Sequence, residues 1–353
     1  MTTAVPPPDD PPTPRVAARR RPRVALVGCG RVGHVHRERL ADLPADIVAV
    51  CDPDSDALAR MANRLPSRPR LFRSEQDLLA AQAVDAVVLC TPHARHAVQV
   101  RAALEAGVHV LCEKPFVTEA DEARELVALA RSRERALFVS LARRARGHAR
   151  FLLAAAGRIA PLQHVVMSRA QPWLARHERT WRVRPDAGGG FLTDAGASLL
   201  DLLLGLAAGT GAAPVPTLLD ARLTRAGTGV DVRASLRLSF APAPHADVTL
   251  IGDAAESVEV IQLFGENGTA GWILREDAPP LLYLRPRSGP AEEADSARFR
   301  GPLPDDAFVT ALATPGRTFG HDHASDLFDA ASVVPLVALL ERIHEEAVWN
   351  QVI

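Results

Sequence analysis

Lysine is almost absent from this chain of 353 residues. Of its 41 basic residues, 40 are arginine and one is lysine, Lys114. Arginine stays protonated in proteins, whereas lysine can exchange a proton. Lys114 is therefore a candidate functional residue, the alternative being that one lysine survived by chance.

Aromatic residues, net charge and long apolar runs are also scarce. Four Trp, one Tyr and eleven Phe offer few platforms for base stacking, and a formal net charge of −1 gives no overall positive field for a polyanion. We therefore expect no nucleic-acid partner. The richest apolar stretch, residues 199–208, is short and contains Asp201, so we expect no membrane-spanning segment.

The N-terminus and the cysteines indicate the expected cellular compartment of the protein. Residues 1–22 contain seven prolines and no apolar periodicity, which predicts a disordered tail. The tail has no apolar signal region and is not rich in serine, so we expect a cytoplasmic protein. The four cysteines form no C-x-x-C pair, and each ends an apolar run. We expect reduced thiols and no metal site.

Apolar runs alternate with helical patterns from residue 23 to about residue 142. The expected strands are residues 23–27, 47–51, 84–90, 109–112 and 136–141, and the expected helices are residues 35–43, 54–63, 74–81, 96–106 and 119–133. Unbroken apolar strands that alternate with helices predict a parallel sheet covered on both faces. Residues 23–142 are thus an expected α/β domain.

The pattern changes after about residue 143. The expected strands are residues 163–170, 218–226, 232–240, 246–251 and 258–264, and the expected helices are residues 190–205 and 324–347. Consecutive strands with polar alternation predict an α+β domain built on a large, mostly antiparallel sheet. Residues 143–353 form this second domain in the prediction, and the proline-rich residues 277–306 are expected to be rich in loops.

A glycine-rich motif follows the first strand. Gly28, Gly30 and Gly33 form a G-x-G-x-x-G pattern, with Arg31 and Val32 between the last two glycines. After a strand and before a helix, this pattern is the fingerprint of dinucleotide binding, with the phosphates at the helix N-terminus. It identifies the first domain as an expected Rossmann domain.

Asp52 ends the second strand, 19 residues beyond Gly33. A carboxylate at this place can accept hydrogen bonds from a ribose 2′-hydroxyl and would repel a 2′-phosphate. The sequence therefore favours NAD(H) as cofactor over NADP(H), which stays open.

Two further motifs complete the pattern. The first is Thr91-Pro92, then His96, and later Glu113-Lys114-Pro115. The second is Trp181-Arg182, followed by Gly-Gly-Gly-Phe-Leu-Thr-Asp-Ala-Gly at residues 188–196. Over residues 23–347 the chain resembles the Gfo/Idh/MocA family of NAD(P)-dependent oxidoreductases.

The resemblance implies a Rossmann domain followed by an α/β domain whose open sheet commonly forms a dimer or tetramer interface. It also implies a sugar-like substrate: a sugar, a cyclitol or a nucleotide-linked form. Thr91, Pro92, His96 and Glu113 would then contact the cofactor or hold its loop. By the same resemblance Lys114 lies beside the nicotinamide and the reacting oxygen, where it can give or take the carbinol proton, and the Lys114–Pro115 bond is a candidate for cis.

The chain departs from the family at one position. Four residues after the motif aspartate, Asp194, the family usually has an acid–base histidine, and here Ser198 stands in its place. A hydroxyl has no basicity near neutral pH. Asp194, Ser198 and Asp201 are spaced as one face of a helix. With Trp181 and Arg144 they are the expected substrate residues, and Arg143 is weighed beside Arg144.

Three interpretations of the missing histidine stay open. Lys114, oriented by Asp194, does the proton transfer alone; another histidine, His164 or His177, enters the site; or the protein binds the cofactor without turnover. The leading hypothesis is hydride transfer between nicotinamide and a secondary alcohol or ketone, with reduction slightly favoured. The alternatives are a sensor or regulatory protein on the same fold and an NAD-using glycosidase.

We predict that NADH raises the melting temperature of the protein more than NADPH does at equal concentration. The reason is the repulsion between Asp52 and a 2′-phosphate. A thermal-shift assay with both cofactors measures this, and Asp52→Ser should narrow the difference. Equal or greater stabilisation by NADPH would contradict the preference.

Overall fold

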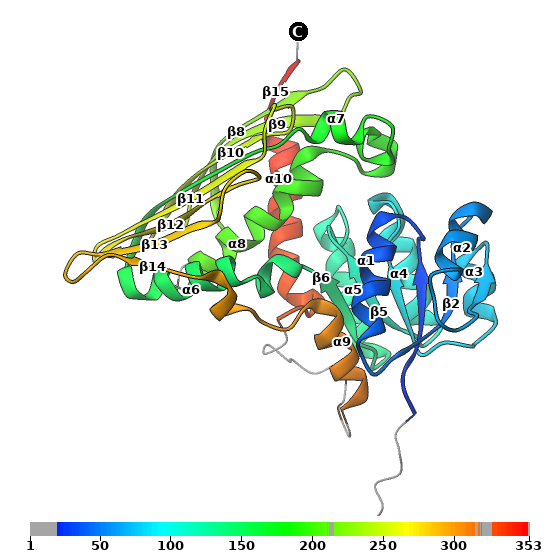
Figure 1. The fold of residues 1–353 in the computed structure, drawn as a ribbon. Helices are drawn as coiled ribbons and strands as arrows, with labels where there is room; N and C mark the ends of the chain where they lie inside the picture. The colour runs from blue at the N-terminus through cyan, green and yellow to red at the C-terminus, as the bar shows by residue number, and fades with distance from the viewer. Residues whose placement is uncertain are drawn as a thin grey trace, which may run out of the picture.

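The computed structural model describes residues 20–209, 211, 215–314, 317, 319 and 327–351. Most of the expected tail, and the first residues of the expected helix at 324–347, lie outside these ranges. Figure 1 shows two units side by side: a sheet with helices on both faces, and a broad curved sheet with helices on one face. This is the fold class that the sequence predicts, a Rossmann-type parallel sheet followed by a mostly antiparallel one.

The first sheet has six parallel strands in the order β3-β2-β1-β4-β5-β6. The strands are β1 (Arg23–Val27), β2 (Asp46–Cys51), β3 (Arg70–Phe72), β4 (Ala86–Leu89), β5 (His109–Glu113) and β6 (Leu137–Ser140), and the helices are α1 (Arg31–Ala41), α2 (Ser55–Ala62), α3 (Glu75–Ala80), α4 (His96–Glu105) and α5 (Ala120–Ser132). The sequence pattern misses β3, because that strand has three residues and none is fully buried.

The second sheet has nine strands in the order β14-β13-β12-β11-β7-β10-β9-β8-β15. The strands are β7 (Leu162–Ala170), β8 (Thr217–Arg225), β9 (Asp231–Ser239), β10 (His245–Ile251), β11 (Val258–Gly265), β12 (Gly268–Arg275), β13 (Leu281–Pro286), β14 (Glu292–Glu293) and β15 (Val348–Gln351). The pairs β7–β10 and β8–β15 are parallel, and the other pairs are antiparallel. In Figure 1, α6 (Gly147–Ile159), α8 (Ala197–Ala208) and α10 (Val334–Glu346) cover one face of this sheet.

The prediction that residues 277–306 are rich in loops is wrong where this stretch forms strands. β13 lies in this stretch, and its Leu282 and Leu284 are buried in the same apolar cluster as the central strands. The flanking prolines suggested a loop, but they stand outside the two alternating leucines that the sheet buries.

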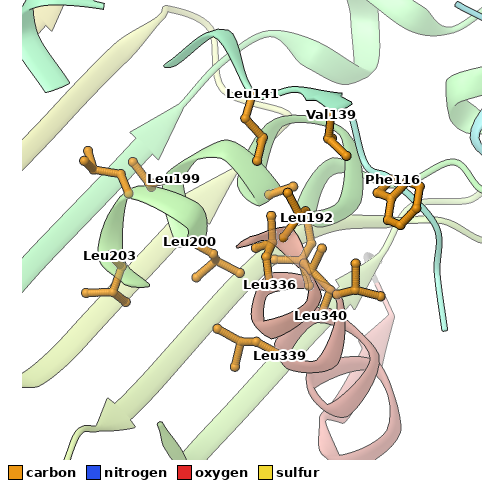
Figure 2. Packing of buried hydrophobic residues seen from close by; sticks show 14 of the residues in the cluster. Phe116, Val139, Leu141, Leu192, Leu199, Leu200, Leu203, Leu336, Leu339 and Leu340 are labelled. Carbon is orange, nitrogen blue, oxygen red and sulfur yellow. The ribbon is translucent and has the colours of Figure 1, made fainter. Parts of the chain in front are cut away.

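Apolar side chains of α8 and α10 join the two units. Figure 2 shows Leu199, Leu200 and Leu203 of α8 together with Leu336, Leu339 and Leu340 of α10. Val139 and Leu141, at the end of β6, and Phe116 reach the same cluster. Because dense packing resists displacement, this cluster fixes the helix that follows Asp194 relative to the strand that precedes Lys114.

The C-terminal part of the chain also packs on the first sheet. The ring of Phe308 in α9 (Pro304–Ala313) lies 5.5 Å from that of Phe138 in β6. The backbone N–H of Val139 donates to the carbonyl of Phe328. The first sheet is therefore completed by residues close to the C-terminus, and the predicted boundary at residues 142/143 stays a prediction.

One stretch of the described residues, Pro185–Ala208, is long and apolar enough for a membrane span, judged by length and composition. Its apolar window is 72% buried inside the fold, as expected for a core helix.

All four cysteines are free thiols. Burial raises the pKa of the Cys29 and Cys51 thiols to about 12.

Gly147 and Gly157 provide a matched pair of substitutions within α6. A Cβ on Gly147 would lie 1.7 Å from the backbone oxygen of Ser296, whereas a Cβ on Gly157 would meet nothing within 4 Å. We predict that Gly147→Ala lowers the free energy of unfolding by about 1–3 kcal/mol through this overlap. Gly157→Ala should raise it by about 0.5–1 kcal/mol, because alanine is the better helix former. Urea unfolding of both variants measures the effects, and equal effects would contradict the packing described.

Candidate active site

A cleft of about 700 Å³ opens where strands of the first sheet end opposite the second sheet. Its lining includes Gly30 after β1, Thr91 after β4, Lys114 after β5 and Leu141 after β6. The strand order reverses between β1 and β4, and such a switch point is where open α/β sheets bind ligands.

The glycine-rich loop leaves space for a phosphate group. Gly28 has a φ of +95°, and a Cβ on it would lie 2.7 Å from the Cys90 oxygen. A Cβ on Gly33 would lie 2.2 Å from the Gly28 oxygen, so helix α1 packs directly on the turn. Nothing lies within 4 Å of a Cβ built on Gly30, and the first turn of α1 has neither an acidic residue nor a side-chain cap. The backbone N–H groups at the start of α1 therefore fit a pyrophosphate.

Arg31 and Val32 open α1 and line the cleft beside this loop. Asp52 follows β2 and is held by two backbone donors, Cys29 N–H at 2.8 Å and Asp54 N–H at 2.9 Å. Both contacts fix its carboxylate next to the glycine-rich turn.

His96 links the loop after β4 to the loop after β5. Its ring is fully buried, and its Nδ1 and Nε2 lie 2.8 Å and 3.1 Å from the carbonyl oxygens of Pro115 and Thr91. Thr91 donates through its hydroxyl to Gln99, and Pro92 begins the turn that leads to His96. His96 thus supports the loop that carries Lys114 from behind the cleft. The Lys114–Pro115 bond is cis, as expected.

Glu113 begins a buried chain of charged groups. Its Oε1 lies 3.0 Å from His36 Nε2, and His36 Nδ1 lies 2.5 Å from Asp305 Oδ1. Arg39 reaches the other oxygen of Asp305 at 3.2 Å. Burial alone would lower the pKa of His36, but hydrogen bonds to Asp305 and Glu113 raise it to about 9. The charged imidazole in turn holds the pKa of Glu113 below its ordinary value, against the effect of burial.

Lys114 and Asp194 form an ion pair in the lining of the cleft. The ammonium Nζ donates to Asp194 Oδ1 at 3.0 Å and to its backbone oxygen at 2.5 Å. The other carboxylate oxygen accepts from Trp173 Nε1 at 2.8 Å and Arg182 Nε at 3.1 Å. Burial would raise the pKa of Asp194, but the charges of Lys114 and Arg182 hold it well below its ordinary value.

Ser198 lies in the cleft, as the motif spacing predicts, and two arginines contact it. Its hydroxyl accepts from Arg143 Nε at 3.3 Å and from Arg169 at 3.5 Å. Arg143 forms a bidentate pair with buried Glu259, at 2.7 Å and 2.9 Å, and Arg169 lies 3.3 Å from the same carboxylate. The guanidinium groups of Arg143 and Arg169 therefore lie beside Ser198, the position at which the family usually has a histidine.

The structure brings one unexpected histidine to the cleft. His93 lines it, donates from Nδ1 to the Gly188 oxygen at 2.9 Å, and packs edge-on against Trp181. Burial first, and then the nearby His96 and Lys114, lower the pKa of His93 to about 3, so its ring is neutral. His177 also lines the cleft. His164 lies on β7, pairs with Asp247 at 3.1 Å and is not part of the lining.

Arg144 and Asp201 do not reach this cleft. They form a pair at 2.5 Å and line a separate cavity of about 280 Å³. Residues 192–196 form a π-helical turn, which interrupts the α-helical register on which the expected face depends. Arg143, the alternative weighed beside Arg144, is the one that lines the cleft.

Sequence reasoning gave no role to His36, His93, Arg146, Arg169 or Asp305. A histidine three residues after Gly33 could have been noted, but its partner Asp305 is distant in the sequence. Among the residues that the structure describes, no three His, Cys, Asp or Glu side chains are grouped as metal ligands.

Two family models match the chain. Residues 22–141 match a model described as "Oxidoreductase family, NAD-binding Rossmann fold", and residues 152–271 match the "GFO/IDH/MocA C-terminal domain". An inositol 2-dehydrogenase/D-chiro-inositol 3-dehydrogenase of Shouchella clausii is 36% identical over 107 residues. This alignment covers 30% of the chain and 31% of that relative, so the match spans about a third of the relative's length.

Solved structures share the fold over nearly the whole chain. The WlbA dehydrogenase of Bordetella pertussis, in complex with NADH and UDP-GlcNAcA, has a TM-score of 0.76 at 22% identity and covers 93% of this chain and 97% of its own. A 3-ketoreductase of Actinomadura kijaniata, in complex with NADP and TDP-benzene, has a TM-score of 0.76 at 21% identity, covering 94% and 100%.

We predict that the buried histidine stabilises the fold in a pH-dependent way. Because its pKa is raised from about 6.5 to about 9, His36 contributes stability that is complete below about pH 6.5 and is lost as the pH rises through 9. The free-energy difference between wild type and His36→Gln should shrink by about 3 kcal/mol over this range.

Urea unfolding between pH 6 and about pH 10 measures this difference. His164→Gln is the matched control, because that ring is 37% exposed and its pair with Asp247 is at the surface, where ion pairs contribute little stability. A flat profile for His36→Gln would show that the imidazole is not charged in the folded protein.

Proposed function

Because the chain belongs to the Gfo/Idh/MocA family, we propose that it is an NAD(P)-dependent oxidoreductase acting on a secondary alcohol or ketone of a sugar, a cyclitol or a related small molecule. The observation that carries the proposal is the ion pair between Lys114 and Asp194, which lies in one cleft with the glycine-rich loop. The only lysine of the chain thus stands where a proton donor or acceptor is needed.

The cleft fits the cofactor at three points. The open space at Gly30 and the uncapped start of α1 suit the pyrophosphate, and Asp52 is oriented for a ribose hydroxyl. Glu113 lies beside Lys114, its charge fixed by His36, and can accept from a sugar hydroxyl. When bound, the nicotinamide would supply or accept the hydride. The fit to Asp52 supports NAD(H) over NADP(H).

Lys114 is proposed as the acid–base residue and Asp194 as the residue that positions it. A carboxylate 3.0 Å from Nζ compensates the charge of the ammonium and aims it into the cleft. An ammonium in this place can donate a hydrogen bond and then a proton to a carbonyl oxygen, which supports the reductive direction. Trp173 and Arg182 hold the far carboxylate oxygen, so the orientation does not depend on Lys114 alone.

Ser198 and His93 are proposed to bind substrate hydroxyls. The hydroxyl of Ser198 is fixed by Arg143 and Arg169. A neutral His93 with Nδ1 on a carbonyl oxygen presents Nε2 as an acceptor. With its pKa lowered to about 3, His93 is not the missing acid. Lys114 therefore remains the proton donor in this proposal, and Trp181 forms a wall of the cleft.

We also propose a homodimer or homotetramer formed through the second sheet. Helices cover one face of this sheet in Figure 1, and the strands of the other face are open. Side chains exposed on β9, such as Arg233, Ser235 and Arg237, are polar, so such an interface would be held by hydrogen bonds and charge pairs.

We predict that Lys114→Arg reduces turnover by at least about 10²-fold, because arginine keeps the charge but does not exchange a proton. Lys114→Met should reduce turnover equally, since proton transfer is what both variants lose. The measurement is NADH oxidation with a panel of keto-sugars and ketocyclitols, beside NADH affinity, which should change little.

Near-normal turnover in Lys114→Arg would refute the role of Lys114, with His177 next to test. Ser198→His is the companion variant: if Ser198 stands at the family's histidine position, an imidazole there changes the rate or the direction while the unfolding midpoint stays the same. Binding of NADH without net oxidation of any substrate, in wild type, would favour a sensor or a glycosidase.

A further inference from the structure

The cleft carries far more positive than negative charge. Seven arginines line it together with Lys114, whereas the acidic side chains among the described residues of its lining are Glu113 and Asp194. The whole chain has a formal net charge of −1, so this excess is a local property of the site. A charge excess within a concave surface attracts ligands of the opposite sign.

Some of these cations are compensated by carboxylates behind the lining. Arg39 belongs to the buried chain that ends at Glu113, in which two positive groups face two negative ones. Arg176 pairs with Glu276 at 2.7 Å. These two arginines therefore leave no net charge for a ligand.

A second group of arginines is not compensated. Arg143 and Arg169 share one carboxylate, that of Glu259, which leaves one positive charge over. The guanidinium of Arg146 is exposed to the cleft and has no hydrogen bond or ion pair with any residue in the described part of the chain. Burial and the like charges of Arg143 and Arg39 lower the pKa of Arg146, and burial and Arg143 lower that of Arg169 to about 10. Both shifts reflect a local excess of positive charge, which Glu259 offsets only in part.

The pyrophosphate of the cofactor is expected at another part of the cleft. Its loop lies at the start of α1, where Arg31 is the lining cation. Arg39, whose charge acts on Arg146, comes eight residues later on the same helix, which is about 12 Å along its axis. The cleft therefore offers two separate positions for anions, one at the helix start and one at Arg146.

The second anion position, at Arg146, lies beside Lys114, the acid–base residue of the proposed function. Arg143 and Arg169 contact Ser198, one helical turn beyond Asp194, which holds Lys114. A ligand group received there would belong to the same molecule that Lys114 protonates. A neutral sugar in this place would leave the arginine charges unbalanced in a partly desolvated site.

We propose that the substrate carries an anionic oxygen group, a carboxylate or a phosphate, and that Arg146 receives it with Arg143 and Arg169 beside it. This inference rests on the proposed function and narrows its substrate class. The guanidinium fork binds such groups through two parallel hydrogen bonds. The site would then select acidic over neutral sugars by charge as well as by shape.

The test uses the full chain saturated with NADH, so that the pyrophosphate position is filled. Calorimetric titrations with D-glucuronate, D-glucose 6-phosphate and D-glucose, at one ionic strength, measure the three dissociation constants. We expect at least one of the two acidic sugars to bind at least about tenfold more tightly than glucose, as hydrogen bonds to charged groups allow. Arg146→Gln should remove this preference and leave NADH affinity unchanged.

Arg150→Gln is the matched control, because Arg150 lies four residues later in α6, is exposed and is not part of the cleft lining. It should keep the preference. Binding of glucose as tight as both acidic sugars, or a preference that survives Arg146→Gln, would overturn the inference while leaving the oxidoreductase proposal intact. Failure of wild type to bind NADH would overturn the proposed function, and with it this inference.

Discussion

The carboxylate of Asp194 is the point on which the geometry of the cleft depends. One oxygen receives the ammonium of Lys114 from the first sheet, and the other receives Trp173 and Arg182 from the segment that precedes it in the second unit. A buried carboxylate needs such partners, because an unpaired charge in this place would cost several kcal/mol. The same contacts that satisfy Asp194 therefore align the two units. The leucines of α8 and α10 keep the helix that follows Asp194 from moving away.

The fold was largely readable from the sequence because its signals are local. Strands such as β1 and β4 are unbroken apolar runs, and the turn at Gly28 permits a backbone that a side chain would block. Residues whose burial depends on distant partners were harder to identify. Strand β13 has only two buried leucines, and α6 is apolar on nearly every face, so neither gave a clear period.

The site was predictable where a motif carried it and not elsewhere. Lys114, Asp194 and Ser198 meet in the cleft because they belong to motifs with fixed spacing. Asp201 does not, since spacing arguments assume an uninterrupted α-helix and this one starts with a π-helical turn. The arginines of the cleft carry no such signal. In a chain with 40 arginines, nothing in the sequence separates Arg146 from those on the surface.

The return of the chain to its first sheet has a consequence for synthesis. A ribosome releases β1 to β6 long before it makes α9, so the nascent Rossmann sheet must wait for its last helix with one flank open. During this interval His36 has no Asp305 beside it, and its ring would be solvated at that flank. Residues near the C-terminus thus close a unit that begins near the N-terminus, and a shortened translation product would expose apolar side chains of β6, such as Phe138, which α9 otherwise covers. Quality control in the cell acts on such exposed apolar surface, so incomplete chains of this protein would be marked by it.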